Sequence, residues 1–224
     1  MKSKITAILL TLVVIMTVFL GSCARNRDYV ESEVLEAAKS LISKSARLNE
    51  IYWGKGIAHD QDKSGANGAY YRATAESTSH YGIKTVDDLI ALTRETFTVD
   101  MANLIVNTRL SSISDEDGIK VYARYYQKYN ALDDTPECIM VYDNADVFLK
   151  DDIIYRYDTL KVSKVVGQSI FVSIDVTVIN SEGDIQSSTL EVELIEEDSG
   201  FRINSPTYKS YTDDDYYNEL QNKI

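Results

Sequence analysis

The side chains that most often carry out catalysis are scarce in this sequence. It contains two cysteines, Cys23 and Cys138, and two histidines, His59 and His80. A Cys–His nucleophile would have to use Cys138, whose surroundings, Pro136-Glu137-Cys138-Ile139, match no setting of a catalytic cysteine. We interpret Cys138 as a small buried apolar residue and each histidine as a loop or surface residue. We therefore predict that the protein is not an enzyme and has no catalytic residue, metal ligand or cofactor.

Other signatures of chemistry are missing or ambiguous. The sequence has no Gly-x-Ser-x-Gly elbow, P-loop or dinucleotide fingerprint. Its 35 acidic residues make some pair of carboxylates look suited to glycoside hydrolysis by chance alone. Asp60-Gln61-Asp62-Lys63-Ser64-Gly65 follows the opening of an EF-hand calcium loop, but the twelfth position is Tyr71 instead of Glu. A polar, glycine-rich turn explains the same residues, so the sequence leaves calcium binding open.

The N-terminus has the pattern of an export signal. Two lysines precede the uncharged apolar run Ile5–Leu20, which ends in Leu20-Gly21-Ser22-Cys23. This pattern resembles the bacterial lipoprotein signal, which implies a diacylglyceryl group on the thiol of Cys23 and cleavage just before it. Residues 1–22 are then the signal peptide and residues 23–28 a lipidated tether. The resemblance implies a lipid anchor on the extracytoplasmic face of the cell membrane, held by two or three acyl chains.

An uncleaved membrane helix is the alternative. The stretch Ile5–Ala24 is uncharged and just long enough to span a bilayer. Two lysines precede it and two arginines follow it, so the positive-inside rule does not decide its orientation. Both alternatives leave residues 25–224 on the outer side of the membrane.

The chain is acidic, with 23 Lys+Arg, 35 Asp+Glu and a formal net charge of −12. Removal of residues 1–22 takes away two lysines and no acid, which leaves 21 basic against 35 acidic residues and a net charge of −14. Binding to nucleic acid needs basic side chains clustered on phosphates, so this balance excludes it. An acidic domain is repelled by anionic lipid and attracted to basic proteins, and we expect a basic protein partner.

Apolar spacing predicts helices in the first part of the chain and strands in the rest. The predicted helices are 28–52, one that starts near Thr85 with a capping box to Asp88, and one that follows the cap Thr98 to about Leu110. Residues 54–68 hold four glycines and many polar residues, which predicts a loop. The predicted strands are 69–74, 119–129, 139–142, 153–157, 160–166, 169–179, 184–195 and 201–203.

The last four of these strands are separated by short turns, which predicts an antiparallel meander. One face of 169–179 consists of Ile and Val, so helices must cover it. We therefore predict an α+β fold in which N-terminal amphipathic helices pack on a C-terminal antiparallel β-meander. Residues 29–212 are expected to form a single domain, and residues 213–224 an acidic tail that contains tyrosine.

Tyrosine is abundant, with 16 residues that often occur in pairs such as Tyr70-Tyr71 and Tyr216-Tyr217. Half-buried positions in strands explain most of them, because tyrosine has a good β propensity. The alternative is a protein-binding surface, since tyrosine beside carboxylates offers a large contact area at a low entropy cost.

One stretch has a family resemblance. An amphipathic helix is followed by Tyr70-Tyr71-Arg72, by Ile83-Lys84-Thr85 leading into Leu89, Ile90 and Leu92, and by Phe97-Thr98 opening a helix through Ala102 and Ile105. This arrangement, about a quarter of the chain, resembles the IseA-type bacterial inhibitors of DL-endopeptidases, which cut the peptide stems of the cell wall. The resemblance implies a non-enzymatic protein that binds and inhibits or regulates peptidoglycan hydrolases. The lipoprotein signal and the acidic stretch Asn130–Asp152 depart from the family, and no inhibitory residue is carried over.

A small-ligand-binding lipoprotein of nuclear-transport-factor-2-like shape is the alternative. In that shape helices close a curved sheet into a cone, which the order of helices and strands also suits. A deep apolar pocket between helix and sheet would favour it. A filled core with an acidic, tyrosine-lined surface would favour the inhibitor.

Overall fold

The structure is a computed structural model that describes residues 29–64, 70–110, 113–114, 120–121, 123–128, 138–143 and 151–208. The helices are α2 (Glu31–Tyr52), α3 (Ala75–Tyr81), α4 (Val86–Thr96) and α5 (Val99–Arg109). The strands are β1 (His59–Ser64), β2 (Tyr70–Ala73), β3 (Ile113–Ser114), β4 (Lys120–Val121), β5 (Tyr125–Lys128), β6 (Cys138–Tyr142), β7 (Asp152–Val166), β8 (Ser169–Ile179), β9 (Ile185–Glu197) and β10 (Gly200–Ile203).

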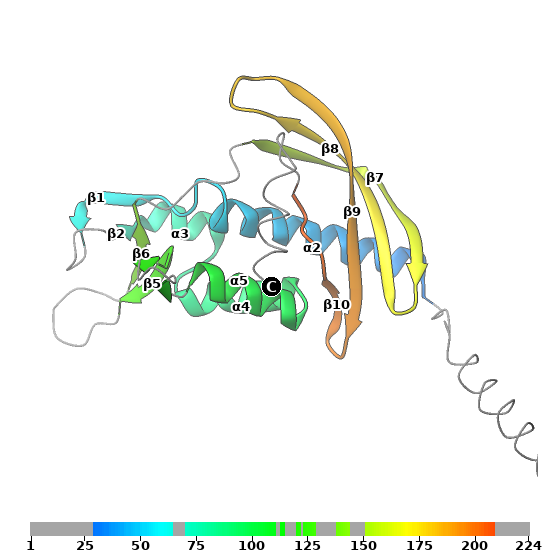
Figure 1. Ribbon diagram of the computed structural model, residues 1–224, viewed down its shortest axis with the longest axis horizontal. Coiled ribbons are helices and arrows are strands. Elements are labelled where there is room, and N and C mark those ends of the chain that lie inside the picture. The colour runs from blue at the N-terminus through cyan, green and yellow to red at the C-terminus, as the bar shows by residue number, and fades with distance from the viewer. Residues whose placement is uncertain are drawn as a thin grey trace, which may run out of the picture.

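Most of the strands form two antiparallel sheets at different places along α2. We call the sheet with the order β1-β2-β6-β5 sheet A and the sheet with the order β10-β9-β8-β7 sheet B, while β3 and β4 pair separately. Figure 1 shows sheet B curving over α2, sheet A near the C-terminal end of that helix, and α4 and α5 on its other side. The fold is the predicted α+β arrangement of helices on a C-terminal meander.

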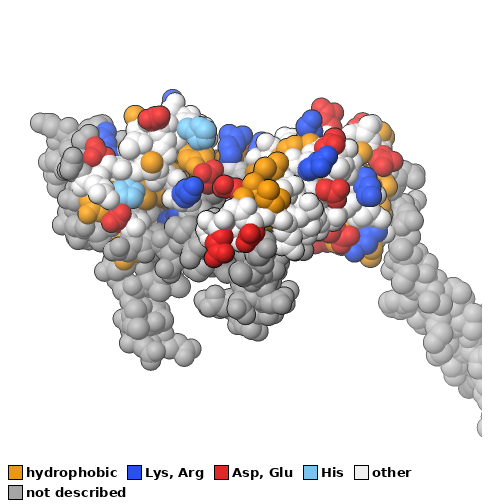
Figure 2. Space-filling model, turned by 90° about the horizontal axis from the view of Figure 1, so that it is seen from above, with side chains coloured by type: hydrophobic (Ala, Val, Ile, Leu, Met, Phe, Trp, Pro, Cys, Tyr) orange, Lys and Arg blue, Asp and Glu red, His pale blue; other side chains and the backbone are white. Residues whose placement is uncertain are grey.

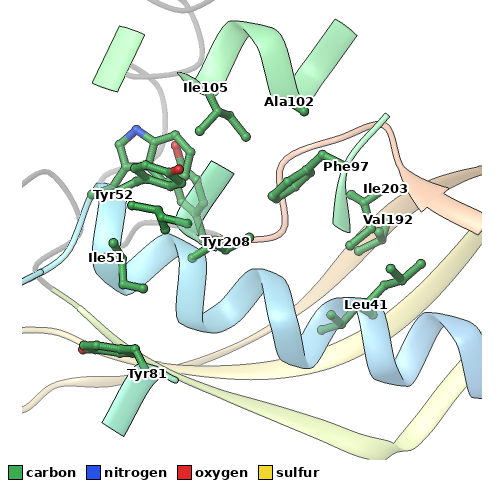
Figure 3. Packing of buried hydrophobic residues seen from close by; sticks show 14 of the residues in the cluster. Leu41, Ile51, Tyr52, Tyr81, Phe97, Ala102, Ile105, Val192, Ile203 and Tyr208 are labelled. Atoms are coloured by element: carbon green, nitrogen blue, oxygen red, sulfur yellow. The ribbon is translucent and has the colours of Figure 1, made fainter. Parts of the chain in front are cut away.

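Sheet B is held on α2 by alternating apolar side chains. Every second residue of β8 points to the helix and is 5% exposed or less, which confirms the predicted inner face: Ile170, Val172, Ile174, Val176 and Val178. Helix α2 contributes the buried Val34, Ala38, Leu41 and Ile42 to the same core. Figure 3 shows Leu41 of α2 beside Val192 of β9 and Ile203 of β10. Burial of such side chains stabilises the fold by about 1.5–3 kcal/mol each.

A buried arginine fixes the other end of α2. Arg124 is 6% exposed, and its guanidinium donates to the carbonyl oxygens of Tyr52 at 2.9 Å and Gly54 at 2.6 Å. The hydroxyl of the adjacent Tyr125 donates to the carbonyl oxygen of Ile51 at 2.7 Å. A helix end leaves such carbonyls without partners inside the helix, and its dipole favours a cation there. We call Arg124 and Tyr125 the helix clamp, because they tie α2 to sheet A.

Thr85 and Thr98 were predicted to cap the N-termini of two helices, which are α4 and α5 in the structure. The Thr85 hydroxyl accepts from the Asp88 N–H at 3.0 Å, and the Asp88 carboxylate accepts from the N–H groups of Thr85 and Lys84 at 2.9 Å, so the capping box is confirmed. Helix α5 follows Thr98 as predicted, but no side-chain bond caps it. The Thr98 hydroxyl instead donates to Asn204 Oδ1 at 2.8 Å, because β10 ends beside it.

Several predicted boundaries are wrong. Residues 54–68 are not all loop, since the polar segment His59–Ser64 is strand β1, held by backbone pairing to β2. The predicted strand 119–129 is broken into β4 and β5 by the helix clamp. The predicted strands 153–157 and 160–166 are one bulged strand, β7, whose register shifts between Arg156 and Lys161.

The segments that carry the targeting prediction lie outside the described residues. These are the signal peptide 1–22 and the tether 23–28 with its lipidation site Cys23. The predicted acidic tail 213–224 also lies outside the described residues. Within the described ranges, no helix is long and apolar enough to cross a membrane.

The helix clamp predicts a large loss of stability in Arg124→Met. Methionine keeps the buried apolar volume but leaves two carbonyl oxygens without their charged donor, which should cost about 3 kcal/mol. Guanidinium unfolding followed by the fluorescence of the single tryptophan, Trp53, measures this cost. The exposed Arg94 is the control, and Arg94→Met should change the unfolding free energy by less than about 0.5 kcal/mol. Equal effects of the two substitutions would contradict the clamp.

The capping box predicts a pH dependence. The backbone N–H groups of Lys84 and Thr85 hold the pKa of Asp88 below its usual range. A lowered folded pKa gives stability that is present above the unfolded pKa and is lost as the pH falls through the folded pKa. Asp88→Asn should therefore destabilise the protein at pH 7 by less than about 1 kcal/mol, since the group is exposed, and should have no effect near pH 2. Thermal unfolding across this range measures the difference, with Asp87→Asn in the same helical turn as the control. A loss of stability that persists at pH 2 would show that the charge is not its cause.

Candidate interaction surface

The outer face of sheet B carries an apolar group at one end. The register places Ile179 of β8 directly opposite Ile185 of β9, and Asp152 of β7 opposite Ile179 on its other side. Ile154 lies two residues further along β7 and points to the same outer face. Ile154 is 52% exposed and Ile185 is 69% exposed. We call Ile154, Ile179 and Ile185 the isoleucine patch.

The middle of the outer face carries charged side chains that bond to one another. Lys164 of β7 pairs with Glu191 of β9 at 2.8 Å and lies 4.2 Å from the ring centre of Phe171 between them. Hydrogen bonds from Lys164 and Ser163 hold the pKa of Glu191 below its usual range. This region is therefore a solvated strand surface whose charges have partners. The isoleucine patch differs from it, because alternation puts three apolar side chains on the side that faces water.

Carboxylates lie at the strand tips beside the patch. Asp151 and Asp152 lie at the start of β7, and Glu182 and Asp184 lie in the β8–β9 turn next to Ile185. The turn is ordered by Asn180, whose Oδ1 accepts from the N–H groups of Glu182 at 3.0 Å and Asp184 at 2.8 Å. Figure 2 shows a group of hydrophobic side chains on the upper face of the molecule with acidic side chains beside it. An exposed apolar centre with a charged rim is the usual anatomy of a protein-binding site.

A groove lies beside this surface. It has a volume of about 280 Å³ and runs between the end of α2 and the start of β7. Arg47 and Lys55 line one side, and Asp151, Asp152 and Tyr155 line the other. The Tyr155 hydroxyl donates to the carbonyl oxygen of Thr207 at 2.7 Å, which fixes that wall. The groove extends the patch with side chains of both charges.

The interior is filled. The buried side chains of α2, α4, α5 and both sheets belong to one hydrophobic cluster. The apolar hollow between Trp53, Phe97, Met101 and Tyr208 has a volume of about 20 Å³, far below the several hundred that a small ligand needs. Along the middle of α2 the buried side chains fill the space against sheet B, and the groove at its C-terminal end is lined largely by polar and charged side chains.

The structure does not bring Cys138 and the histidines together. Cys138 is half-buried in β6 rather than buried as expected, and its Sγ donates to Met140 Sδ at 3.7 Å. The reason is its position at the start of β6, where it lines an open groove. His59 Nε2 lies 2.9 Å from Asp143 Oδ1, and its ring stacks on Tyr71. His80 is exposed on α3.

The possible calcium segment takes a different form from an EF-hand. Its first five residues, Asp60–Ser64, belong to strand β1, whereas an EF-hand loop bends its ligands around the ion. Among the described residues, no group of three or more His, Cys, Asp or Glu side chains could hold a metal ion.

Four of the described tyrosines belong to the protein interior. Tyr52, Tyr81 and Tyr125 are buried, and desolvation raises the pKa of each phenol above its usual value. The Tyr70 hydroxyl donates to the carbonyl oxygen of Ala123 at 2.7 Å, within sheet A and its flank. These tyrosines therefore stabilise the fold and do not form a binding surface. The exposed apolar side chains at the end of sheet B that carries the β8–β9 turn are isoleucines.

Sequence reasoning missed the isoleucine patch. Its three residues come from three strands, and their proximity depends on the register of β7, β8 and β9. A usable signal was present, since Ile179 directly precedes the predicted turn 180–183 and Ile185 follows it by two residues. Ile179 also alternates with the Ile–Val face of β8, so it points to the opposite side of the sheet.

Comparisons with family models, with curated proteins and with solved structures find no match for this chain. The resemblance to the IseA-type inhibitors stays a prediction, as does the lipoprotein signal. The surface and the fold described above are therefore the grounds for any functional proposal.

Proposed function

We propose that this chain is a lipid-anchored extracytoplasmic protein without enzymatic activity, and that it binds a basic protein partner through the isoleucine patch. The partner class that we propose is the cell-wall peptidoglycan hydrolases, specifically DL-endopeptidases, which the protein inhibits. The proposal has three parts: the binding surface, the charge of the partner, and the location.

The observation that carries the proposal is the isoleucine patch with four carboxylates at the adjoining strand tips. An exposed isoleucine gains about 25 cal/mol for each Å² that a partner removes from water. The four acids around the patch favour a partner with basic side chains, because complementary charge speeds the encounter and excludes acidic competitors. The net charge of −14 expected after signal cleavage acts in the same direction over a longer range.

The proposed location supplies the choice of partner. A diacylglyceryl group on Cys23 would keep the domain at the outer side of the membrane, next to the wall. A wall hydrolase binds an anionic polymer, so its substrate cleft is expected to be basic in places. The acidic rim of the isoleucine patch could then occupy such a cleft and imitate the charge of the substrate.

The filled interior favours surface binding over the small-ligand alternative. A nuclear-transport-factor-2-like binder needs a hollow between its helices and its curved sheet. In this structure the described side chains of α2, among them Leu41 and Ile42, occupy that space against β8 and β9. We therefore do not propose a small ligand.

The proposal predicts the behaviour of a double variant, Ile154→Asp with Ile185→Asp. The purified full-length protein in detergent should inhibit a DL-endopeptidase acting on isolated peptidoglycan. The double variant should raise the inhibition constant at least about tenfold, because two apolar anchors are lost. Its unfolding free energy should stay within about 0.5 kcal/mol of the original, since both residues are more than half exposed.

Val99→Asp is the matched control, because Val99 is 61% exposed and lies at the start of α5, away from the patch. This variant should inhibit like the original protein. Absence of inhibition by the original protein at excess would remove the hydrolase as the partner. Equal inhibition by the double variant and the original would remove the isoleucine patch as the surface.

A further inference from the structure

Strand β7 runs toward the N-terminal end of α2, so the β7–β8 turn lies at the same end of the protein as the predicted tether 23–28. Tyr155 lines the groove together with Asn49, near the C-terminal end of α2. Two residues further along the strand, the ring of Tyr157 lies 5.9 Å from the Lys39 amine, in the N-terminal half of α2. Strand β7 therefore runs toward the start of the helix. Figure 1 shows the β7–β8 turn beside the start of α2, where the chain leaves for the N-terminus.

The tether is short. Five residues, 24–28, separate Cys23 from Tyr29, the first described residue. An extended chain spans at most about 3.6 Å per residue, so Tyr29 lies within about 20 Å of an acylated Cys23. This step rests on the lipid anchor of the proposed function. It means that the end of the domain with the β7–β8 turn is held close to the bilayer.

That end exposes apolar side chains. Among the described residues, six large apolar side chains are exposed, and three of them belong to this end: Tyr29 at 37%, Val30 at 55% and Val166 at 60%. Two of the others, Ile154 and Ile185, lie at the far end of sheet B. The 11 residues of β8 separate the two ends, a path of at most about 35 Å along the curved strand (Figure 1). The exposed apolar surface of sheet B is thus divided between its two tips.

We propose that Tyr29, Val30 and Val166 form a membrane-contact surface that rests in the headgroup region of the bilayer. Valine and tyrosine side chains suit that depth, where apolar and polar groups meet. Glu31 and Glu33 in the first turn of α2 oppose anionic lipid, so the contact is stronger on zwitterionic than on anionic bilayers. The isoleucine patch is then held at the opposite tip of sheet B, further from the bilayer.

Depth-dependent quenching tests this orientation. The acylated full-length protein carries Cys138→Ala, so that the introduced cysteine is the reactive thiol. One variant adds Val166→Cys and the other adds Ile185→Cys, and each new cysteine is labelled with an environment-sensitive dye. Both proteins are placed in phosphatidylcholine vesicles whose lipids carry a nitroxide quencher near the headgroup. The label at position 166 should lose at least about half of its fluorescence, while the label at position 185 keeps its intensity, because quenching acts over about 10 Å. A second label at Val30→Cys should behave like the one at position 166.

Flotation of the same vesicles separates the possible failures. Protein that floats with the vesicles while the labels at positions 30, 166 and 185 are quenched equally would overturn the membrane-contact surface and leave the anchor intact. Protein that does not float would overturn the anchor of the proposed function, and this inference with it. Stronger quenching at position 166 on phosphatidylglycerol than on phosphatidylcholine would contradict the role given to Glu31 and Glu33.

Discussion

Arg124 carries a positive charge into the interior of this protein, and the positions of the other elements depend on how that charge is satisfied. Among the described residues its hydrogen-bond partners are carbonyl and hydroxyl oxygens, with Tyr52, Gly54 and Tyr125 at 2.6–3.1 Å. A buried guanidinium is costly unless its donors are all used, and the C-terminal end of a helix offers both free carbonyls and a negative dipole. Gly56 has a φ of +77°, which favours glycine. A side chain at this position would also overlap Arg124 and Tyr125. The clamp thereby fixes α2 with respect to sheet A.

A fixed α2 determines which surfaces are left for function. The helix runs from the clamp at one end to sheet B at the other, and its apolar side chains fill the concave side of that sheet. The groove that remains beside the end of α2 is lined largely by polar and charged side chains. The outer face of sheet B is free, and alternation along β7, β8 and β9 places three isoleucines on it beside carboxylates. The surface that we propose for binding therefore lies at the end of sheet B far from the start of α2.

Local patterns in the sequence were enough to predict much of the fold. The turns around Gly167, Gly183 and Gly200 have positive φ and lie where the glycines indicated, so β8, β9 and β10 were predicted nearly to the residue. The Thr85 capping box is equally local. Sheet A was not recognised as a sheet, because β1 is polar and lacks the alternating apolar residues that indicate a strand. Arg124 resembled any basic residue in a strand, since its role depends on a helix about 70 residues away.

The candidate surface was beyond sequence reasoning for a related reason. Exposed isoleucine is recognised only when the register of three strands is known. The tyrosine-and-acid binding surface stays a prediction, although Tyr52, Tyr81 and Tyr125 are buried and belong to the core.

Hydrogen exchange of the acylated protein on vesicles, measured with and without a bound DL-endopeptidase, tests the central claim most directly. Slower exchange confined to the amides of 152–156 and 177–187, with no change in the β7–β8 turn, is the result that a partner on the isoleucine patch predicts. Protection that falls instead on sheet A, or exchange that the enzyme leaves unchanged everywhere, would contradict it.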